Sequence, residues 1–289
     1  MPTPPSVLLC SDLDRTLLPN GAHPESPRAR PLLNALAKQN TLSLAYVSGR
    51  DIRLLQAAVR DYRIPLPRYA VGDVGTTIYE IRGEQWQPLP EWTEQIRPDW
   101  NDADPQDVAQ LFRDLTELTL QEPDKQGAFK ISFYAHPSID RKALFEEMEQ
   151  RLNHCGVRAN LIWSIDEAID TGLLDILPAS ADKLHAIRFL IARNHIDPEL
   201  VVFAGDSGND LPVLTSDIQS IVVANAHPDV ITSAQNELTH RGDPASLYVA
   251  KGDFLGMNGN YSAGVLEGLT HYIEPANEWL TRAAATLDT

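Results

Sequence analysis

Residues 7–16 read VLLCSDLDRT, and this stretch decides the fold class and contains the first candidate site. Its first half is a short apolar run, and the first charged residue after that run is Asp12. This pattern is typical of a buried parallel strand whose carboxyl end is open to solvent. Asp12 and Asp14 follow that strand end at spacing i, i+2. A carboxylate placed there can attack phosphorus, while a second one protonates the departing oxygen and later deprotonates water. Aspartates are also common in turns and helix caps, so the DxDxT run alone does not establish catalysis.

Strand and helix patterns alternate along the chain around this run. The segment that follows it predicts helices over 27–39 and 51–62, and strands over 42–47, 69–71 and 76–81. After residue 178 the alternation returns, with helices over 182–194 and 266–272 and strands over 201–204 and 220–224. Strands separated by helices in this order predict a parallel sheet with crossover helices.

Between these two blocks the pattern changes. Residues 82–178 contain helix-like stretches over 104–120 and 139–153, and strand-like runs over 129–135, 157–164 and 173–177. We therefore expect an α/β protein in two parts. Residues 1–81 and 179–289 would form a Rossmann-like, doubly wound parallel sheet core, and residues 82–178 an inserted, smaller α+β domain.

The composition excludes some classes of partner. The chain has 289 residues, of which 43% are apolar, and is long enough to bury a substantial core. With 40 acidic against 24 basic residues, its formal charge is −16. Such a surface repels nucleic-acid phosphates and anionic lipid, so we expect no nucleic acid and no membrane as partner. The two cysteines form no CxxC pair and the first residues show no signal segment, which favours a reducing, cytoplasmic setting.

Three further spots carry residues suited to phosphate chemistry. Ser48-Gly49-Arg50 follows a strand at the start of a helix, where a hydroxyl and backbone N–H groups can bind an anion. Lys183 begins the helix after the insert and could place an ammonium against a phosphoryl oxygen. Residues 205–210, GDSGND, gather the oxygen ligands that magnesium prefers. Taken singly, Ser-Gly is more often a helix cap and a lysine more often a surface residue.

In this order, the four spots resemble the signature of the haloacid dehalogenase-like phosphohydrolase superfamily, which reads DxDxT, then Ser or Thr, then Lys, then GDxxND. The match covers the sheet domain, and the combination is far more specific than any one piece. The insert lies between the second and third motifs. This resembles the branch whose α/β cap domain occupies that place and which acts mostly on sugar phosphates and other small phosphates, and it implies that residues 82–178 form a substrate-specificity cap.

A narrower resemblance, to sucrose-phosphate phosphatases, extends over most of the chain. The segments that carry it are 12–14 (DLD), 45–50 (AYVSGR), 70–72 (AVG), 78–79 (IY), 130–134 (KISFY), 173–178 (LLDILP), 205–210 (GDSGND) and 262–266 (SAGVL). The resemblance implies a Mg²⁺-dependent phosphatase for a sugar phosphate, with sucrose 6-phosphate as the first candidate. Enzymes for other disaccharide phosphates, such as mannosylfructose phosphate, share much of this pattern.

Carried over by position, the resemblance implies roles for the charged residues of three motifs. Asp12 would be the nucleophile and Asp14 the general acid and base. Mg²⁺ would be held by Asp12, by a backbone oxygen of Asp14 and by Asp206. Lys183 would neutralise the phosphoryl charge. Because several carboxylates so close together repel one another, the metal and Lys183 must offset them or the nucleophile would take a proton.

The same resemblance implies further contacts to the phosphate. Ser48 and Gly49 would bind it together with Lys183 and Asn209. Asp210 would orient Lys183 and the metal-bound water.

Substrate contacts are expected at residues that add positive charge or hydroxyl groups. Lys130, in the insert, is a candidate for binding sugar hydroxyls, and Thr76 and Tyr79 for forming a wall of the pocket. Arg50 would add positive charge. Arg15 is a departure, because the position after the second aspartate is usually Gly or Asn in these families. The Arg15 side chain either adds positive charge to the site, contacts the substrate or points outward into solvent.

Two other interpretations stay open. One is a phosphatase for another glycosyl phosphate: mannosylfructose phosphate, glucosylglycerol phosphate or a glycosyl-phosphoglycerate. The other is a non-catalytic sugar-phosphate-binding partner of a glycosyltransferase. That second role predicts the loss of catalytic residues, whereas all the expected ones are present. An enzyme that docks to a partner glycosyltransferase is compatible with the same residues.

Overall fold

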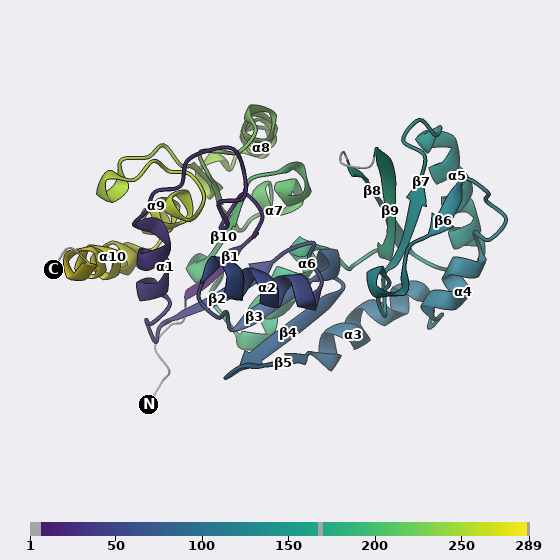
Figure 1. The fold of residues 1–289 in the computed structure, drawn as a ribbon, viewed down its shortest axis with the longest axis horizontal. Coiled ribbons are helices and arrows are strands. Elements are labelled where there is room, and N and C mark those ends of the chain that lie inside the picture. Colours follow the sequence, from purple (N-terminus) through teal and green to yellow (C-terminus); the bar gives the residue numbers. More distant parts are fainter. Residues whose placement is uncertain (1–6, 167–169, 288–289) are drawn as a thin grey trace. The chain divides into compact units, whose positions relative to one another are not determined.

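A computed structural model of the chain describes residues 7–166 and 170–287. The chain forms two compact units, one comprising Met1–Pro88 and Lys183–Thr289 and the other Leu89–Asp182 (Figure 1). Within the described ranges, no helix is both long enough and apolar enough to cross a membrane.

The larger unit is built on an eight-stranded sheet of order β12-β11-β10-β1-β2-β3-β4-β5. Its strands are β1 (Val7–Ser11), β2 (Leu42–Val47), β3 (Tyr69–Gly72), β4 (Thr77–Arg82), β5 (Gln85–Pro88), β10 (Val201–Gly205), β11 (Gln219–Val222) and β12 (Leu247–Val249). The strands from β12 to β3 are parallel, and β4 and β5 add an antiparallel hairpin at one edge. The expected parallel α/β core is confirmed.

Strand β1 lies where the sheet changes direction. It pairs with β10 on one side and β2 on the other, and Ser11 lies opposite Ala204 and Tyr46. From β1 the chain winds outward through β2 and β3, and from β10 it winds the opposite way through β11 and β12. The carboxyl ends of β1, β2 and β10 therefore meet at one edge, which is where open α/β sheets build their binding sites.

The division between the units differs slightly from the sequence-based one. We placed residues 82–88 in the insert, whereas β5 pairs with β4 through the register of Ile81 with Trp86. The hairpin therefore belongs to the large sheet, and the smaller unit begins at Leu89. At the other end, residues 179–182, which we placed in the core, belong to the smaller unit, which ends at Asp182.

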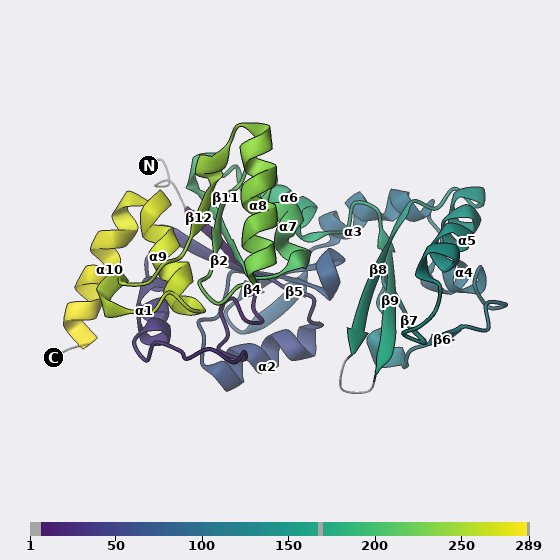
Figure 2. The same ribbon diagram turned by 90° about the horizontal axis from the view of Figure 1, so that it is seen from above.

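Helices cover both faces of the large sheet (Figure 2). They are α1 (Ala29–Leu36), α2 (Ile52–Tyr62), α6 (Lys183–Asn194), α7 (Leu211–Leu214), α8 (Pro228–Arg241), α9 (Ser262–Tyr272) and α10 (Glu274–Leu287). Helices α1, α2, α9 and α10 contribute to one buried cluster with the strands. Helices α6, α7 and α8 pack against one another in succession.

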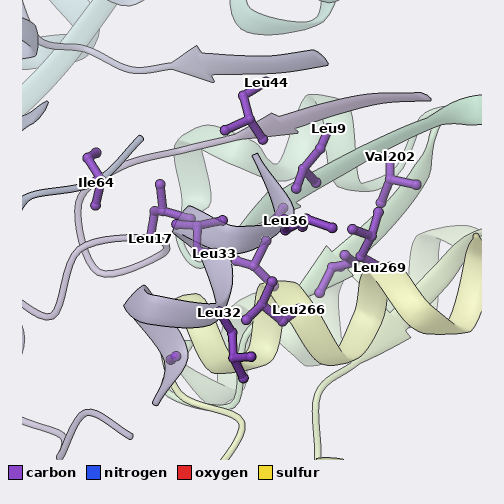
Figure 3. Close-up of a cluster of buried hydrophobic side chains, with 14 of the residues drawn as sticks. Leu9, Leu17, Leu32, Leu33, Leu36, Leu44, Ile64, Val202, Leu266 and Leu269 are labelled. Atoms are coloured by element: carbon purple, nitrogen blue, oxygen red, sulfur yellow. The ribbon is translucent and has the colours of Figure 1, made fainter. Parts of the chain in front are cut away.

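The buried cluster fixes the central strands (Figure 3). Leu9 of β1 and Val202 of β10 lie in it with Leu266 and Leu269 of α9, and all four side chains are at most 1% exposed. Burying one such side chain contributes about 1.5–3 kcal/mol. Leu8, on the other side of the β1 pleat, is buried outside this cluster. Because β1 is packed from both faces, the chain that leaves its carboxyl end starts from a fixed position.

The smaller unit is an antiparallel sheet of order β6-β7-β9-β8 with helices on one face (Figure 1). Its strands are β6 (Leu118–Leu120), β7 (Ile131–Ala135), β8 (Ala159–Asp166) and β9 (Thr171–Pro178), and its helices are α3 (Pro90–Ile96), α4 (Pro105–Gln110) and α5 (Arg141–His154). Phe133 and Leu174 pair across β7 and β9 and are buried. Trp163 pairs with Leu174 and lies under Arg141 of α5, so this is the helix-covered face. The expected α+β character is confirmed.

One expected element in this unit is wrong. The sequence suggested a helix over 104–120, but α4 ends at Gln110 and Leu118–Leu120 form β6, which pairs antiparallel with β7. Arg151 of α5 donates from Nη1 to the carbonyl oxygen of Leu111 at 2.7 Å. This contact satisfies a carbonyl just past the end of α4, and the alternation of Leu118 and Leu120 suits a strand.

Candidate active site

Asp12 and Lys183 meet although 171 residues separate them in the sequence. Asp12 extends from β1, its N–H donates to the carbonyl oxygen of Ala204 at 2.9 Å, and it is 5% exposed. Lys183 is the first residue of α6 and is 4% exposed. Its Nζ donates to Asp12 Oδ1 at 2.8 Å and to Asp210 Oδ1 at 2.7 Å, and lies 3.4 Å from Asn209 Oδ1. A single ammonium thus joins the carboxylates of two different strand ends.

The loop after β10 is folded around Asp210. Asp210 is fully buried, and its Oδ2 accepts the N–H groups of Asp206 and Ser207, both at 3.1 Å. A Cβ at Gly205 would lie 2.7–2.8 Å from the Asp210 side chain, so only glycine fits there. Asp210 therefore holds the loop with one oxygen and Lys183 with the other, which is the geometry expected of an orienting residue.

Three buried carboxylates form one acidic cluster. Asp12, Asp206 and Asp210 each offer an oxygen within 4.8 Å of the other two. Burial raises the pKa of Asp12 to about 7; Lys183 lowers it, while Asp210 and Asp206 raise it further. Burial also raises the pKa of Asp206 to about 6, with a smaller increase from Asp210. For Lys183, burial would lower the pKa, yet Asp12 and Asp210 raise it overall.

The cluster is suited to a hard divalent cation. Three buried carboxylates face one buried ammonium, that of Lys183, and one largely exposed guanidinium, that of Arg15, so negative charge exceeds positive charge at the cluster. Carboxylate and backbone oxygens are the ligands that Mg²⁺ takes in proteins. The residues present therefore fit a metal at this place.

Thr16 and Arg15 contact Asp206 from the loop after β1. Thr16 Oγ1 donates to Asp206 Oδ1 at 3.0 Å. Arg15 Nε lies 3.5 Å from Asp206 Oδ2, although the arginine side chain is 60% exposed. Both residues directly follow Asp14 in the DxDxT segment. Their contacts with Asp206 therefore connect the DxDxT segment to the GDSGND segment. Arg15 thus adds positive charge beside Asp206, and its contact with substrate stays a prediction.

Asp14 is bound by a bidentate ion pair with Arg50. Arg50 donates from Nε to Asp14 Oδ2 at 2.8 Å and from Nη2 to Oδ1 at 2.5 Å. Asn20 adds a bond from Nδ2 to Asp14 Oδ1 at 2.6 Å. Burial would raise the pKa of Asp14, but the hydrogen bonds from Arg50 and Asn20 outweigh it and the pKa is lowered. Arg50, expected at the substrate, is thus engaged with the expected acid and base.

Ser48 and Gly49 lie at the neighbouring strand end. The register of Ser11 with Tyr46 places Ser48 just beyond β2, beside the chain that continues from β1. Ser48 is 1% exposed, and its Oγ accepts from the N–H of Arg50 at 3.3 Å. Gly49 is exposed. Both therefore lie at the edge of the sheet that carries Asp12.

Thr76 and Tyr79 lie beyond the next strand, β3. Thr76 is buried, and its hydroxyl donates to the carbonyl oxygen of Asp73 at 3.0 Å. Tyr79 packs edge-on against Trp86, with ring centroids 6.2 Å apart. These contacts make both residues part of the β3–β5 framework, and their role at the substrate stays a prediction. Lys130, in the smaller unit directly before β7, also keeps its expected role only as a prediction.

A cavity of about 540 Å³ opens next to Asp206 within the larger unit. Arg15, His23 and His227 line it together with Asn225 and Tyr261. Of the three clustered carboxylates, that of Asp206 lines this cavity.

Two side chains at this site were not assigned a role from the sequence. Thr16 was part of the DxDxT motif, so its motif position was the available signal. Asn20 lies in a Pro-Asn-Gly turn, and nothing in that turn pattern points to Asp14.

The fold and the convergent cluster define a class of protein, the haloacid dehalogenase-like phosphatases. Three groups meet at one edge of the sheet. They are an aspartate at the end of a strand, a lysine at the start of a later helix, and an acidic loop that follows the neighbouring strand. The profile of the sucrose-6F-phosphate phosphohydrolase family matches residues 5–273, and the chain belongs to that family.

Known relatives agree with this placement. A Nitrosococcus oceani protein named only as a HAD-like hydrolase is 52% identical over 274 residues, 95% of this chain and 74% of that protein. The mannosylfructose-phosphate phosphatase of Agrobacterium fabrum is 28% identical and is aligned over 93% of this chain and 97% of its own length. The X-ray structure of the sucrose-phosphatase from Synechocystis sp. PCC6803, in complex with sucrose and phosphate, gives a TM-score of 0.68 at 21% identity, covering 93% of this chain and 98% of that one. At that identity the likeness concerns the fold.

Proposed function

We propose that the protein hydrolyses sucrose 6-phosphate to sucrose and phosphate, through an aspartyl-phosphate on Asp12 and with Mg²⁺ at the acidic cluster. The observation that carries the proposal is the contact of Lys183 Nζ with Asp12 Oδ1 at 2.8 Å beside the Asp206 and Asp210 carboxylates. Phosphoryl transfer needs a buried nucleophile, a buried cation and further carboxylates that can bind a metal, all at one place.

In the first step, a carboxylate oxygen of Asp12 forms a bond to phosphorus while the bond from phosphorus to the sugar oxygen breaks. Asp14 gives a proton to that sugar oxygen. In the second step, Asp14 takes a proton from water as the water oxygen attacks phosphorus, which releases phosphate and restores the Asp12 carboxylate. Lys183 stays close to Asp12 and offsets the negative charge that gathers on the phosphoryl oxygens.

The ion pair between Arg50 and Asp14 bears on both steps. It keeps Asp14 ionised, which suits the removal of a proton from water. To donate a proton in the first step, Asp14 has to gain one, and this requires its bonds to Arg50 and Asn20 to loosen. We therefore propose that substrate binding draws Arg50 toward the phosphoryl group, consistent with its expected place at the substrate.

Bound Mg²⁺ would screen the approach of the anionic nucleophile to the anionic phosphoryl group. We propose Asp12, Asp206 and a backbone oxygen of Asp14 as its ligands. Asp210 is engaged with Lys183 and with two backbone N–H groups, so its part is to orient the lysine. Ser48, Gly49 and Asn209 remain our candidates for phosphate binding.

The smaller unit is our candidate for sugar recognition and hence for the cap. The face of its sheet opposite the helices carries Ser132 and Tyr134 of β7 and Asp175 of β9. Ser132 Oγ donates to Asp175 Oδ1 at 2.5 Å, and the Tyr134 hydroxyl donates to Glu122 Oε2 at 2.9 Å. Ser132 is buried and holds Asp175 in place, whereas Tyr134 and Asp175 are partly exposed. Their hydroxyl and carboxylate suit the hydroxyl groups of a sugar, and Lys130 directly precedes β7. A glycosyltransferase that makes the sugar phosphate is the partner implied.

The test is phosphate release by the purified protein from a panel of glycosyl phosphates: sucrose 6-phosphate, mannosylfructose phosphate, glucosylglycerol phosphate and a glycosyl-phosphoglycerate, with p-nitrophenyl phosphate as reference. We expect sucrose 6-phosphate to have the highest kcat/KM and a chelator to abolish turnover. Preference for another member of the panel would replace the substrate but keep the class. If no sugar phosphate is preferred over the aryl phosphate, the sugar-phosphatase proposal is wrong.

The nucleophile is tested by Asp12→Asn, which keeps the shape and removes the attacking charge. We expect no turnover from a folded protein. Asp229→Asn, at an exposed position of α8, is the matched control and should behave as wild type. Turnover of Asp12→Asn near that of wild type would reject Asp12 as nucleophile.

A further inference from the structure

The loop after the two aspartates begins with a strained residue. Arg15, between Asp14 and Thr16, has φ 58°, in the left-handed region that non-glycine residues rarely adopt. Tyr261, at the start of α9, has φ 52° and ψ −135° and is fully buried. Such strained conformations persist only where their surroundings hold them.

One side chain bridges both strained residues. Asn225 lies in the turn after β11. Its Nδ2 donates to the carbonyl oxygen of Arg15 at 2.6 Å, and its Oδ1 accepts the N–H of Tyr261 at 2.8 Å. Both ends of this amide are used, and each is bonded to the backbone of a residue with positive φ. Three segments that are distant in the sequence are therefore tied together at one group.

The bridge leads directly to the proposed acid and base. The N–H of Arg15 donates to Asn20 Oδ1 at 2.8 Å, and Asn20 Nδ2 donates to Asp14 Oδ1 at 2.6 Å. The carbonyl that Asn225 holds belongs to the peptide bond between Arg15 and Thr16. The N–H that supports Asn20 belongs to the preceding peptide, which joins this one at the Cα of Arg15. A change of backbone conformation at Arg15 would therefore alter the support of Asn20 and, through it, of the Asp14 carboxylate.

The buried ring of Tyr261 supports the far end of the same loop. Its hydroxyl accepts the N–H of His23 at 3.1 Å and lies 3.2 Å from the His23 carbonyl oxygen, to which it donates. A Cβ at Gly21 would lie only 2.8 Å from this hydroxyl, so the loop passes close to the tip of the Tyr261 side chain. Asn225 thus fixes the start of the loop and also the residue that supports its end.

We infer that Asn225 is a positioning residue for the phosphatase reaction, holding the Arg15 peptide and Tyr261 so that Asp14 and Thr16 keep their reactive places. The inference rests on the proposed function. Asn225 contacts the backbone of Arg15 rather than the reacting atoms, so its effect is on the turnover of bound substrate and not on the affinity for it.

Two substitutions separate the parts of the bridge. Asn225→Asp keeps the shape and the oxygen that accepts from Tyr261, but it turns an oxygen toward the carbonyl of Arg15 in place of the donor. Asn225→Ala removes both bonds. A displacement of about 1 Å at a reacting group costs about 10²-fold in rate. We expect kcat to fall by about 10²-fold in both variants, with KM close to that of wild type.

The control is Asn277→Asp on the exposed surface of α10, which makes the same change of charge and shape away from the loop. Turnover of p-nitrophenyl phosphate with MgCl₂ gives kcat and KM. Amide hydrogen exchange without substrate is followed on the peptide covering residues 13–24, and thermal unfolding is recorded for every variant. We expect faster exchange confined to 13–24 in both Asn225 variants, an unchanged unfolding midpoint in Asn225→Asp, and wild-type behaviour in the control.

The inference is overturned if both Asn225 variants turn over at the wild-type rate. It is also overturned if exchange rises throughout the protein together with a lowered unfolding midpoint, because Asn225 would then be only structural. A wild-type protein without phosphatase activity would instead refute the proposed function. The exchange of residues 13–24 would still decide whether Asn225 holds this loop.

Discussion

Replacing Lys183 by methionine removes the buried positive charge with little change in side-chain length. Lys183 Nζ lies 2.8 Å from Asp12 Oδ1 and 2.7 Å from Asp210 Oδ1. At an effective dielectric constant of ~20, each contact is worth about 6 kcal/mol before the cost of desolvation. Removing one partner of a buried ion pair typically costs about 3–5 kcal/mol of stability. Losing a preorganised charge partner of the transition state costs ~10²–10³ in kcat.

The two losses respond differently to pH. Lys183 lowers the pKa of Asp12, so its removal raises that pKa further above about 7 and leaves the nucleophile protonated at neutral pH. Raising the pH should therefore recover part of the kcat of Lys183→Met. A folded-state pKa above the unfolded one means that folding favours the protonated form. The stability penalty should accordingly be smallest below the ordinary pKa of aspartate and grow as the pH rises through the folded pKa.

The assay is phosphate release between pH 5 and pH 9 at one fixed, sub-saturating MgCl₂ concentration, together with thermal unfolding of the metal-free protein over the same range. Lys142→Met is the matched control, because Lys142 is exposed on α5. Wild-type kcat in Lys183→Met, or a kcat deficit that does not lessen with rising pH, would refute the role given to Lys183.

Three further outcomes are expected. Because burial raises the pKa of Asp12 to about 7, binding of Mg²⁺ must displace protons, so the rise in unfolding temperature on adding Mg²⁺ should grow from pH 5 to pH 8; a pH-independent rise would contradict this. Gly205→Ala should lower kcat by about 10²-fold because its Cβ would strike Asp210, whereas Gly208→Ala, whose Cβ meets no described atom within 4 Å, should not; equal kinetics would contradict the packing argument. Leu266→Ala should cost about 2–5 kcal/mol in denaturant unfolding without changing KM, and a loss below 1 kcal/mol would argue against its place in the core.

Sequence patterns predicted the framework of the site well, because strand ends and turn glycines are local signals. The apolar run before Asp12 and the run before Asp206 predicted two parallel strands, and these are adjacent in the sheet. The helix pattern over 182–194 placed Lys183 at the start of a helix, and α6 begins at Lys183. These successes share one cause: each depends on residues within a few positions of one another.

Contacts between distant side chains could not be predicted in the same way. Nothing near Arg50 in the sequence indicates that it pairs with Asp14, and the Asn225 amide could have formed an ordinary turn contact. The helix expected over 104–120 gave way to a strand because pairing with β7 outweighed the local helix propensity. In each case a partner far along the chain decides the outcome.

The long separation between the nucleophile and its lysine has a consequence for protein synthesis. A growing chain that has reached residue 182 already contains Asp12 but neither the ammonium nor the GDSGND loop. At that point β1 can pair with β2, but β10 has not yet been synthesised. The sheet edge at which Asp12, Asp206 and Asp210 lie together is therefore incomplete. The chemistry proposed for Asp12 therefore requires the second half of the sheet, which is synthesised after the inserted unit.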